Sequence, residues 1–224
     1  MRIGGFHKFS LIDYPGKMAA VIFIQGCNFR CGYCHNPQLV FPPQCGRPVD
    51  ESVVLEFLQS RQGKLQGVVV TGGEPTIHHG LLDFLARVKS MNYMVKLDTN
   101  GSHPEVLMAA IDLGLLDFIA MDIKTSFTRY EGATGVKTDL TRIRFSIDLI
   151  IKSGLPHQFR TTLVKSHCSD EDLKDIRTLI GAAKSYVLQP FVPASAIIDM
   201  GLLAKQQYTR QEVLDLQRQF QLGR

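Results

Sequence analysis

The sequence predicts an α/β fold, an incomplete (β/α)6 barrel of parallel strands, and three observations support this prediction. Apolar, β-branched runs of strand length recur six times, stretches with helical periodicity lie between them, and the two kinds of segment alternate. Such alternation indicates right-handed crossovers and a parallel sheet. A chain of 224 residues has room for six such units rather than the eight of a closed barrel.

Each predicted strand coincides with an apolar run, and the six runs are 18–24, 67–71, 93–99, 117–123, 158–163 and 186–191. The stretches with helical periodicity between or after them are 50–61, 80–91, 104–113, 140–153 and 169–183, and the glutamine-rich tail 206–221 also reads as a helix. Asp50 and Ser169 are capping residues at two helix starts. In parallel α/β folds reactive groups lie at the carboxyl ends of strands, so the chemistry is expected just after each apolar run.

Composition indicates one globular domain over residues 1–224, with 1–17 as an N-terminal extension and 205–224 as a C-terminal helix. The chain is 45% hydrophobic and 21% charged, which is enough to bury a substantial core. The net charge of +4 is scattered, which gives no support for nucleic-acid binding. No run approaches the roughly 20 apolar residues of a membrane helix. Residues 1–8 lack the pattern of a signal peptide, so a cytoplasmic location is expected.

Three of the five cysteines, Cys27, Cys31 and Cys34, follow the first predicted strand, while Cys45 and Cys168 stand alone. This is a poor disulfide framework, and in a cytoplasmic chain such clustering favours metal or redox chemistry. Three thiolates in one short loop can hold a four-iron cluster and leave one iron open to a substrate or cofactor. The spacing therefore predicts a redox-catalytic iron–sulfur site.

A structural zinc site is the alternative, with His35 as a fourth ligand. His35 directly follows Cys34, whereas structural zinc sites usually take their second ligand pair from a separate knuckle further along the chain. Catalytic-thiol and thioredoxin-like sites need fewer than three thiols. The iron–sulfur interpretation is therefore favoured.

Two motifs at predicted strand ends resemble those of the radical S-adenosylmethionine superfamily. Tyr33 is the aromatic residue just before the last cysteine, and Gly-Gly-Glu-Pro at 72–75 directly follows the second strand. Within the superfamily, the segments 8–16, 25–31, 34–37, 97–101 and 121–124 resemble the activating enzymes of glycyl-radical enzymes. The likeness is closest to the activating proteins of anaerobic ribonucleoside-triphosphate reductases.

The resemblance implies a [4Fe-4S] cluster on the three clustered cysteines and S-adenosylmethionine as cofactor. The cluster would reductively cleave the cofactor to a 5'-deoxyadenosyl radical, which abstracts hydrogen from a glycine of a partner protein. The implied partners are a glycyl-radical enzyme, here anaerobic ribonucleotide reductase, and a flavodoxin or ferredoxin-type electron donor. Neither a membrane nor a nucleic acid is expected, and no catalytic residue is expected beyond the cluster and the cofactor.

The resemblance also implies a set of cofactor-binding residues at the strand ends: Tyr33, Gly72, Gly73, Glu74, Asp98, Thr99, Asp122, Lys124 and Arg160. Asp98, Thr99 and Asp122 would hold a monovalent cation against the cofactor carboxylate. The simpler interpretation of Asp98 is a cap on the next helix. Lys124 would pair with these carboxylates or the substrate, and Arg160 would reach the ribose or the carboxylate of the cofactor.

Two other functions stay open. One is a radical S-adenosylmethionine enzyme acting on a small molecule, such as a deazapurine or nucleotide precursor, although the segments 34–37 and 97–101 favour the activase. The other is a cluster-bearing redox sensor, which would have no need for Gly-Gly-Glu at 72–74, Asp98 or Asp122. The histidines are given no role, because hydrogen abstraction of this kind requires no general base.

Overall fold

The computed structural model describes residues 1–41, 44–193 and 196–221. The chain forms two compact units, which are described separately. The first unit comprises Met1–Asn28, Gln38–Thr99 and His103–Ala120, and the second comprises Phe29–Pro37, Asn100–Ser102 and Met121–Arg224.

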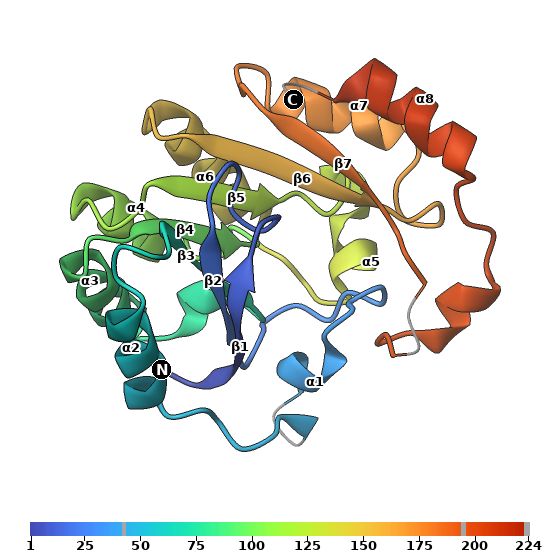
Figure 1. The fold of residues 1–224 in the computed structure, drawn as a ribbon. Coiled ribbons are helices and arrows are strands. Elements are labelled where there is room, and N and C mark those ends of the chain that lie inside the picture. The colour runs from blue at the N-terminus through green and yellow to red at the C-terminus, as the bar shows by residue number, and fades with distance from the viewer. Residues whose placement is uncertain (42–43, 194–195, 222–224) are drawn as a thin grey trace. The chain divides into compact units, whose positions relative to one another are not determined.

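The first unit is built on neighbouring strands that follow one another in chain order (Figure 1). They are β1 (Ile3–Ser10), β2 (Ala19–Ile24), β3 (Gly67–Gly72), β4 (Met94–Thr99) and the start of β5 (Phe118–Asp122). β1 is antiparallel to β2, whereas the pairs β2/β3 and β3/β4 are parallel. The pairing places Ile24 opposite Gly72, so the loops that follow β2 and β3 leave the sheet side by side.

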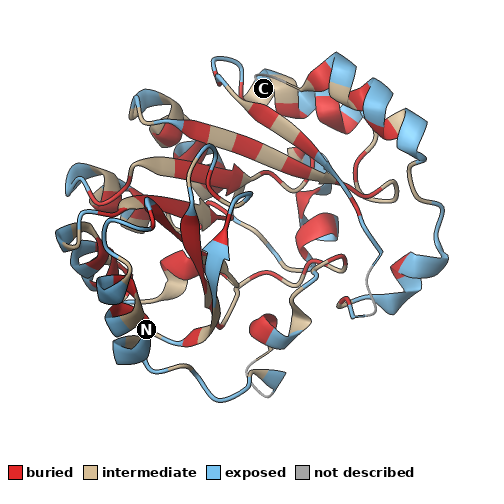
Figure 2. Ribbon diagram, in the orientation of Figure 1, coloured by how far each residue is buried: buried red, intermediate tan, exposed pale blue. Residues whose placement is uncertain are grey.

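Helices of the first unit bury one face each. They are α1 (Pro37–Val40), α2 (Glu51–Ser60), α3 (Leu81–Ser90) and α4 (Pro104–Asp112), and a 3-10 helix covers Pro75–Ile77. Asp50 caps α2 by accepting a hydrogen bond from the Ser52 amide. Val68, Val69 and Val70 of β3 are fully buried, as expected for a strand covered on both faces (Figure 2).

The second unit contains the end of β5 and the parallel strands β6 (His157–Leu163) and β7 (Tyr186–Pro190). Its helices are α5 (Tyr130–Thr134), α6 (Leu140–Lys152), α7 (Asp170–Leu179) and α8 (Arg210–Phe220). Burial alternates along β6, so Phe159 and Thr161 face the interior and Arg160 faces the opposite, less buried side.

The structure confirms the predicted α/β fold, because all six predicted strands and the helices between them are present within a few residues. Parallel pairing of strands in chain order is consistent with an incomplete barrel. β1 was not predicted, since residues 1–17 were expected to be an extension that precedes the first strand. Its sequence carries two glycines and three exposed residues, so it forms a strand through pairing with β2 rather than through its own pattern.

The predicted C-terminal helix is present as α8, although residues 222–224 lie outside the described residues. A single domain over 1–224 stays a prediction. Among the helices of the described ranges, none is both long and apolar enough to cross a membrane.

Candidate functional site

In the first unit, the loop after β3 is hydrogen-bonded to the backbone that leads into Cys27. The Gly73 amide donates to the carbonyl oxygen of Ile24 at 2.8 Å, and the Glu74 amide donates to the carbonyl oxygen of Gly26 at 2.8 Å. The Gly-Gly-Glu segment and the start of the cysteine loop therefore form one framework.

The two glycines of this segment are required by that close approach. A Cβ atom on Gly73 would lie 1.9 Å from the Gly26 carbonyl oxygen, and one on Gly72 would lie 2.3 Å from the Ile24 nitrogen. Gly72 also has a φ of +111°, which side-chain-bearing residues rarely adopt. The resemblance assigns these glycines to the cofactor, and the structure adds that they let the β2 and β3 ends touch.

Glu74 connects the end of β3 to the end of β4. Its side chain is buried, and Oε1 accepts hydrogen bonds from the Thr76 amide at 3.1 Å and the Thr76 hydroxyl at 2.5 Å. The hydroxyl of Thr99 donates to the same oxygen at 2.8 Å. Hydrogen bonds to a charged oxygen are among the stronger ones, so three predicted site segments are held together through Gly26, Glu74 and Thr99.

Asp98 is ion-paired with Lys96, two residues earlier in β4. Alternate residues of a strand share a face, so the two side chains point the same way. The Lys96 side chain is only 3% exposed and that of Asp98 14%. Lys96 was not among the predicted site residues, although a lysine two positions before a strand-end aspartate in an apolar run was a usable signal.

His78 forms a hydrogen bond to the backbone that precedes Cys27. Its Nε2 lies 2.7 Å from the carbonyl oxygen of Gln25 and, because a carbonyl only accepts, this nitrogen carries the hydrogen. Burial lowers the pKa of His78, which favours the neutral ring. The side chain of Gln25 in turn donates to the Gly46 carbonyl oxygen at 2.8 Å. No role was predicted for His78, because hydrogen abstraction needs no general base, and no local pattern records a contact between residues 53 positions apart.

In the second unit, Cys31 and Cys34 lie on one tight turn. The Cys34 amide donates to the Cys31 carbonyl oxygen at 3.0 Å. Burial raises the pKa of the Cys31 thiol, and the ammonium of Lys124 partly opposes this effect. The turn is anchored at Arg30, whose amide donates to the Thr134 carbonyl oxygen at the end of α5 at 2.7 Å.

Tyr33, the aromatic residue of the cysteine motif, is buried in the second unit. Its ring centroid lies 6.0 Å from that of His167, and burial raises the pKa of its hydroxyl well above the usual value. The Thr125 hydroxyl fixes the backbone of His167 by donating to its carbonyl oxygen at 2.7 Å. The Asp199 amide donates to the Gly32 carbonyl oxygen at 2.8 Å. Tyr33 therefore positions the cysteine loop by packing.

His35 is engaged with residues that follow β7. Its Nε2 lies 2.6 Å from the Val192 carbonyl oxygen, and its ring stacks on Phe191 with centroids 5.6 Å apart. A nitrogen that donates to a carbonyl oxygen leaves the lone pair of the ring on the other nitrogen, Nδ1. The contact therefore fixes the orientation of His35 and leaves the zinc alternative untested.

Asp122, the last residue of β5, is joined by Lys124, two residues further on, and by Arg160 from the middle of β6. Arg160 Nε lies 2.7 Å from Asp122 Oδ1, and Lys124 Nζ lies 3.2 Å from Asp122 Oδ2. Burial acts to raise the pKa of the Asp122 carboxyl, but its two cationic partners outweigh it and hold that pKa well below the usual range. The group therefore carries one negative and two positive charges near neutral pH.

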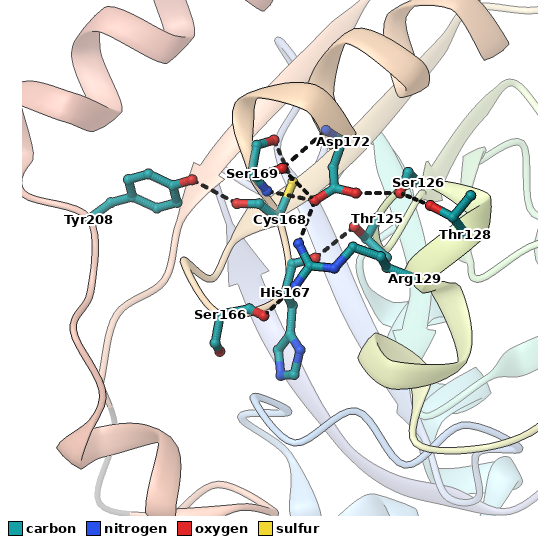
Figure 3. A network of polar contacts seen from close by, with 10 residues as sticks. All are labelled: Thr125, Ser126, Thr128, Arg129, Ser166, His167, Cys168, Ser169, Asp172 and Tyr208. Carbon is teal, nitrogen blue, oxygen red and sulfur yellow. Dashed lines mark hydrogen bonds and ion pairs between the residues drawn. The ribbon is translucent and has the colours of Figure 1, made fainter.

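The loops after β5 and β6 are tied together by the buried carboxylate of Asp172 (Figure 3). It accepts hydrogen bonds from the Ser126 hydroxyl, from Arg129 at 2.7 Å and from the Ser169 amide at 2.7 Å. Arg129 also donates to the Ser166 carbonyl oxygen at 2.7 Å. This network holds the loops that continue from the strands of the predicted cofactor residues.

The three predicted cluster ligands belong to different units, with Cys27 in the first and Cys31 and Cys34 in the second. Within the described parts of the chain, no group of three or more His, Cys, Asp or Glu side chains is placed to hold a metal ion. The ligand set therefore stays a prediction. Cys168 is fully buried and its pKa is raised to about 12 by burial, as suits a packed thiol, whereas Cys45 is half-buried.

Residues 21–180 match the family model of the Radical SAM superfamily. The chain belongs to the radical SAM superfamily. This confirms the family predicted from the cysteine and Gly-Gly-Glu-Pro motifs, and with it an enzyme of the radical SAM class. The family implies a [4Fe-4S] cluster and S-adenosylmethionine as cofactors.

Similar radical SAM proteins include one of Methanocaldococcus jannaschii, which is described as a candidate glycyl-radical enzyme activating enzyme. It is 35% identical over 200 residues, which cover 87% of this chain and 81% of that protein. The pyruvate formate-lyase-activating enzyme of Clostridium pasteurianum is 32% identical over 130 residues, covering 54% and 53%. The 7-carboxy-7-deazaguanine synthase of Methanopyrus kandleri is 29% identical over 131 residues, covering 50% and 51%.

A solved structure that contains S-adenosylmethionine shares the fold. Streptococcus suis SuiB bound to S-adenosylmethionine aligns with a TM-score of 0.65 at 13% identity, covering 89% of this chain and 49% of that chain. At this level of identity the likeness concerns the fold alone.

Proposed function

We propose that the chain activates a glycyl-radical enzyme, with anaerobic ribonucleotide reductase as the partner. The main support for this proposal is the pair of 2.8 Å hydrogen bonds that join the Gly-Gly-Glu loop to the backbone preceding Cys27. These bonds join Gly73 and Glu74 to Ile24 and Gly26, which supports a cofactor motif beside a cluster ligand at Cys27. The similarity to the Methanocaldococcus protein over most of both chains favours an activase within the superfamily.

Cys27, Cys31 and Cys34 would hold the [4Fe-4S] cluster. When bound, the cluster supplies the electron that breaks a carbon–sulfur bond of the sulfonium. The chain fits this group, since Cys31 and Cys34 share a tight turn and the Lys124 ammonium stabilises a thiolate at Cys31. A flavodoxin or ferredoxin-type protein is the proposed electron donor.

The remaining predicted residues would bind S-adenosylmethionine. The Gly-Gly-Glu loop presents backbone with no side chain at residues 72 and 73, and Glu74 adds a carboxylate for the amino group of the cofactor. Lys124 and Arg160 are cationic groups of the kind that suits the cofactor's carboxylate.

The test is hydrogen transfer from the partner. Anaerobically reconstituted protein, S-adenosylmethionine and a reductant are mixed with a glycyl-radical enzyme deuterated at the glycine α-carbon. We expect deuterium in the released 5'-deoxyadenosine, methionine as co-product, and an oxygen-sensitive doublet electron spin resonance signal on the partner. Cys31→Ser should abolish both signals, while Cys45→Ser, a matched thiol substitution outside the motif, should retain them.

A small-molecule substrate is the second candidate, and the similarity to the Methanopyrus 7-carboxy-7-deazaguanine synthase over half of each chain supports it. Cofactor cleavage without label transfer or partner radical, across glycyl-radical enzymes from the same organism, would favour this candidate over the activase.

A further inference from the structure

Lys96 is a buried cation beside a residue that the resemblance assigns to a metal cation. Its ammonium is paired with the Asp98 carboxylate in the first unit, and its side chain is 3% exposed. A lysine is seldom buried in an apolar strand unless a counter-charge compensates it. The neighbouring strand residues Val95 and Leu97 are fully buried, so this ion pair lies in an apolar part of β4.

The negative charges of Asp98 and Asp122, the two carboxylates among the three predicted cation ligands, are already offset by cationic side chains. In the first unit, Asp98 is paired with Lys96. In the second unit, Asp122 is paired with Lys124 and Arg160. A carboxylate whose charge is already compensated attracts a further cation only weakly, because the cation already present repels it. The residues present therefore do not fit a monovalent metal ion.

We infer that the ammonium of Lys96 replaces a monovalent metal cation at Asp98, so that this chain binds S-adenosylmethionine without Na⁺ or K⁺. The inference rests on the proposed cofactor site. It differs from the expectation that Asp98, Thr99 and Asp122 bind a free cation. A tethered ammonium supplies the same charge whatever the salt, and Thr99 is already committed to Glu74.

The test compares cofactor affinity in choline chloride, NaCl and KCl at equal ionic strength, by calorimetric titration of anaerobically reconstituted protein. Choline is too large to enter a site made for a bare ion. Wild type should bind S-adenosylmethionine with the same affinity, within about twofold, in all three salts. Lys96→Met, which keeps length and loses charge, should bind about tenfold more weakly in choline, and Na⁺ or K⁺ should restore most of the affinity.

Two control variants separate this role from a general loss of an ion pair. Lys89→Met removes a similar pair in the same unit, in which Lys89 Nζ lies 2.8 Å from Asp117 Oδ2, and should leave affinity and salt response unchanged. Lys96→Met combined with Asp98→Asn removes both charges and should show no response to Na⁺ or K⁺.

A cofactor-free measurement keeps the two proposals distinguishable. Sodium-23 line broadening should appear with Lys96→Met and be absent with wild type and with the double variant. If the wild-type protein fails to bind S-adenosylmethionine in all three salts, the proposed cofactor site is wrong. The sodium-23 measurement then still tests the role of Lys96. Wild-type affinity that requires Na⁺ or K⁺, or sodium broadening in wild type equal to that in Lys96→Met, would overturn the inference.

Discussion

Replacing Gly73 with alanine should separate the two loops that carry the predicted cofactor motif and the first predicted cluster ligand. The new Cβ would lie 1.9 Å from the Gly26 carbonyl oxygen and 2.6 Å from its carbon, whereas real Cβ atoms essentially never come within 3.0 Å of another atom. The atom it meets is backbone, so no side-chain rotation relieves the contact. The loops must therefore move apart by about 1 Å.

A shift of about 1 Å stretches the hydrogen bond from Glu74 to Gly26 well beyond the usual N–H···O range. The neighbouring bond from Gly73 to Ile24 is strained by the same movement. Two hydrogen bonds contribute about 1–3 kcal/mol together, and overpacking costs about as much. The hydrogen-bond cost and the overpacking cost arise from the same displacement of the loops, so they are not added together. We expect a loss of about 2–3 kcal/mol in unfolding free energy, or about 4–12 °C in Tm for a chain of this size.

Thermal unfolding of the apoprotein measures the stability loss, and calorimetric titration of the reconstituted protein with S-adenosylmethionine measures the functional one. Gly46→Ala is the matched control, because a Cβ there meets nothing within 4 Å. If Gly73→Ala unfolds at the temperature of Gly46→Ala and binds the cofactor as wild type does, the close approach of the two loops does not require glycine and the reasoning is refuted.

Three further predictions concern other parts of the site. Iron analysis after anaerobic reconstitution should give about four irons per chain in wild type, Cys45→Ser and Cys168→Ser, and loss of the catalytic cluster in Cys27→Ser, Cys31→Ser and Cys34→Ser; an indispensable Cys45 would contradict the ligand set. His78→Ala should shift the reduction potential of the cluster, because the backbone before Cys27 loses its 2.7 Å support, whereas the exposed neighbour variant His79→Ala should not. Burial acts to raise the pKa of the Asp172 carboxyl, but hydrogen bonds from Ser126, Ser169 and Arg129 outweigh it and lower that pKa below the usual 3.8. The ionised carboxylate therefore stabilises the folded protein fully above pH 3.8, and this contribution is lost as the pH falls through the lowered pKa. Urea unfolding of Asp172→Asn should therefore show lower stability than wild type at pH 7 and a difference that shrinks below about pH 4; a constant difference would contradict this.

The sequence predicted those features that local pattern controls. The buried run Val68–Val70 identified β3, and the position of Gly-Gly-Glu directly after it placed the motif at a strand end. The strand β1 was not predicted, because few of its residues are buried and it forms a strand only by pairing with β2. The contact of His78 with Gln25 was not predicted for a related reason, since the two residues are 53 positions apart and no local pattern records such a contact.

The pairing of Lys96 with Asp98 lies between these cases. Strand alternation is enough to put both on one face, so the sequence contained the neighbour relation. The sequence did not show that Lys96 is buried, and this burial distinguishes its ion pair with Asp98 from an ordinary ion pair at the surface.

The Asp172 network has a consequence for how the second unit opens. Because one carboxylate holds the Ser126 hydroxyl, Arg129 and the Ser169 amide, the loops after β5 and β6 lose their restraints in the same event rather than one after the other. Amide hydrogens in both loops should therefore exchange with solvent at a common opening rate. Lys124, two residues after β5, and Arg160, in the middle of β6, would then be exposed to water together, as one cooperative opening unit.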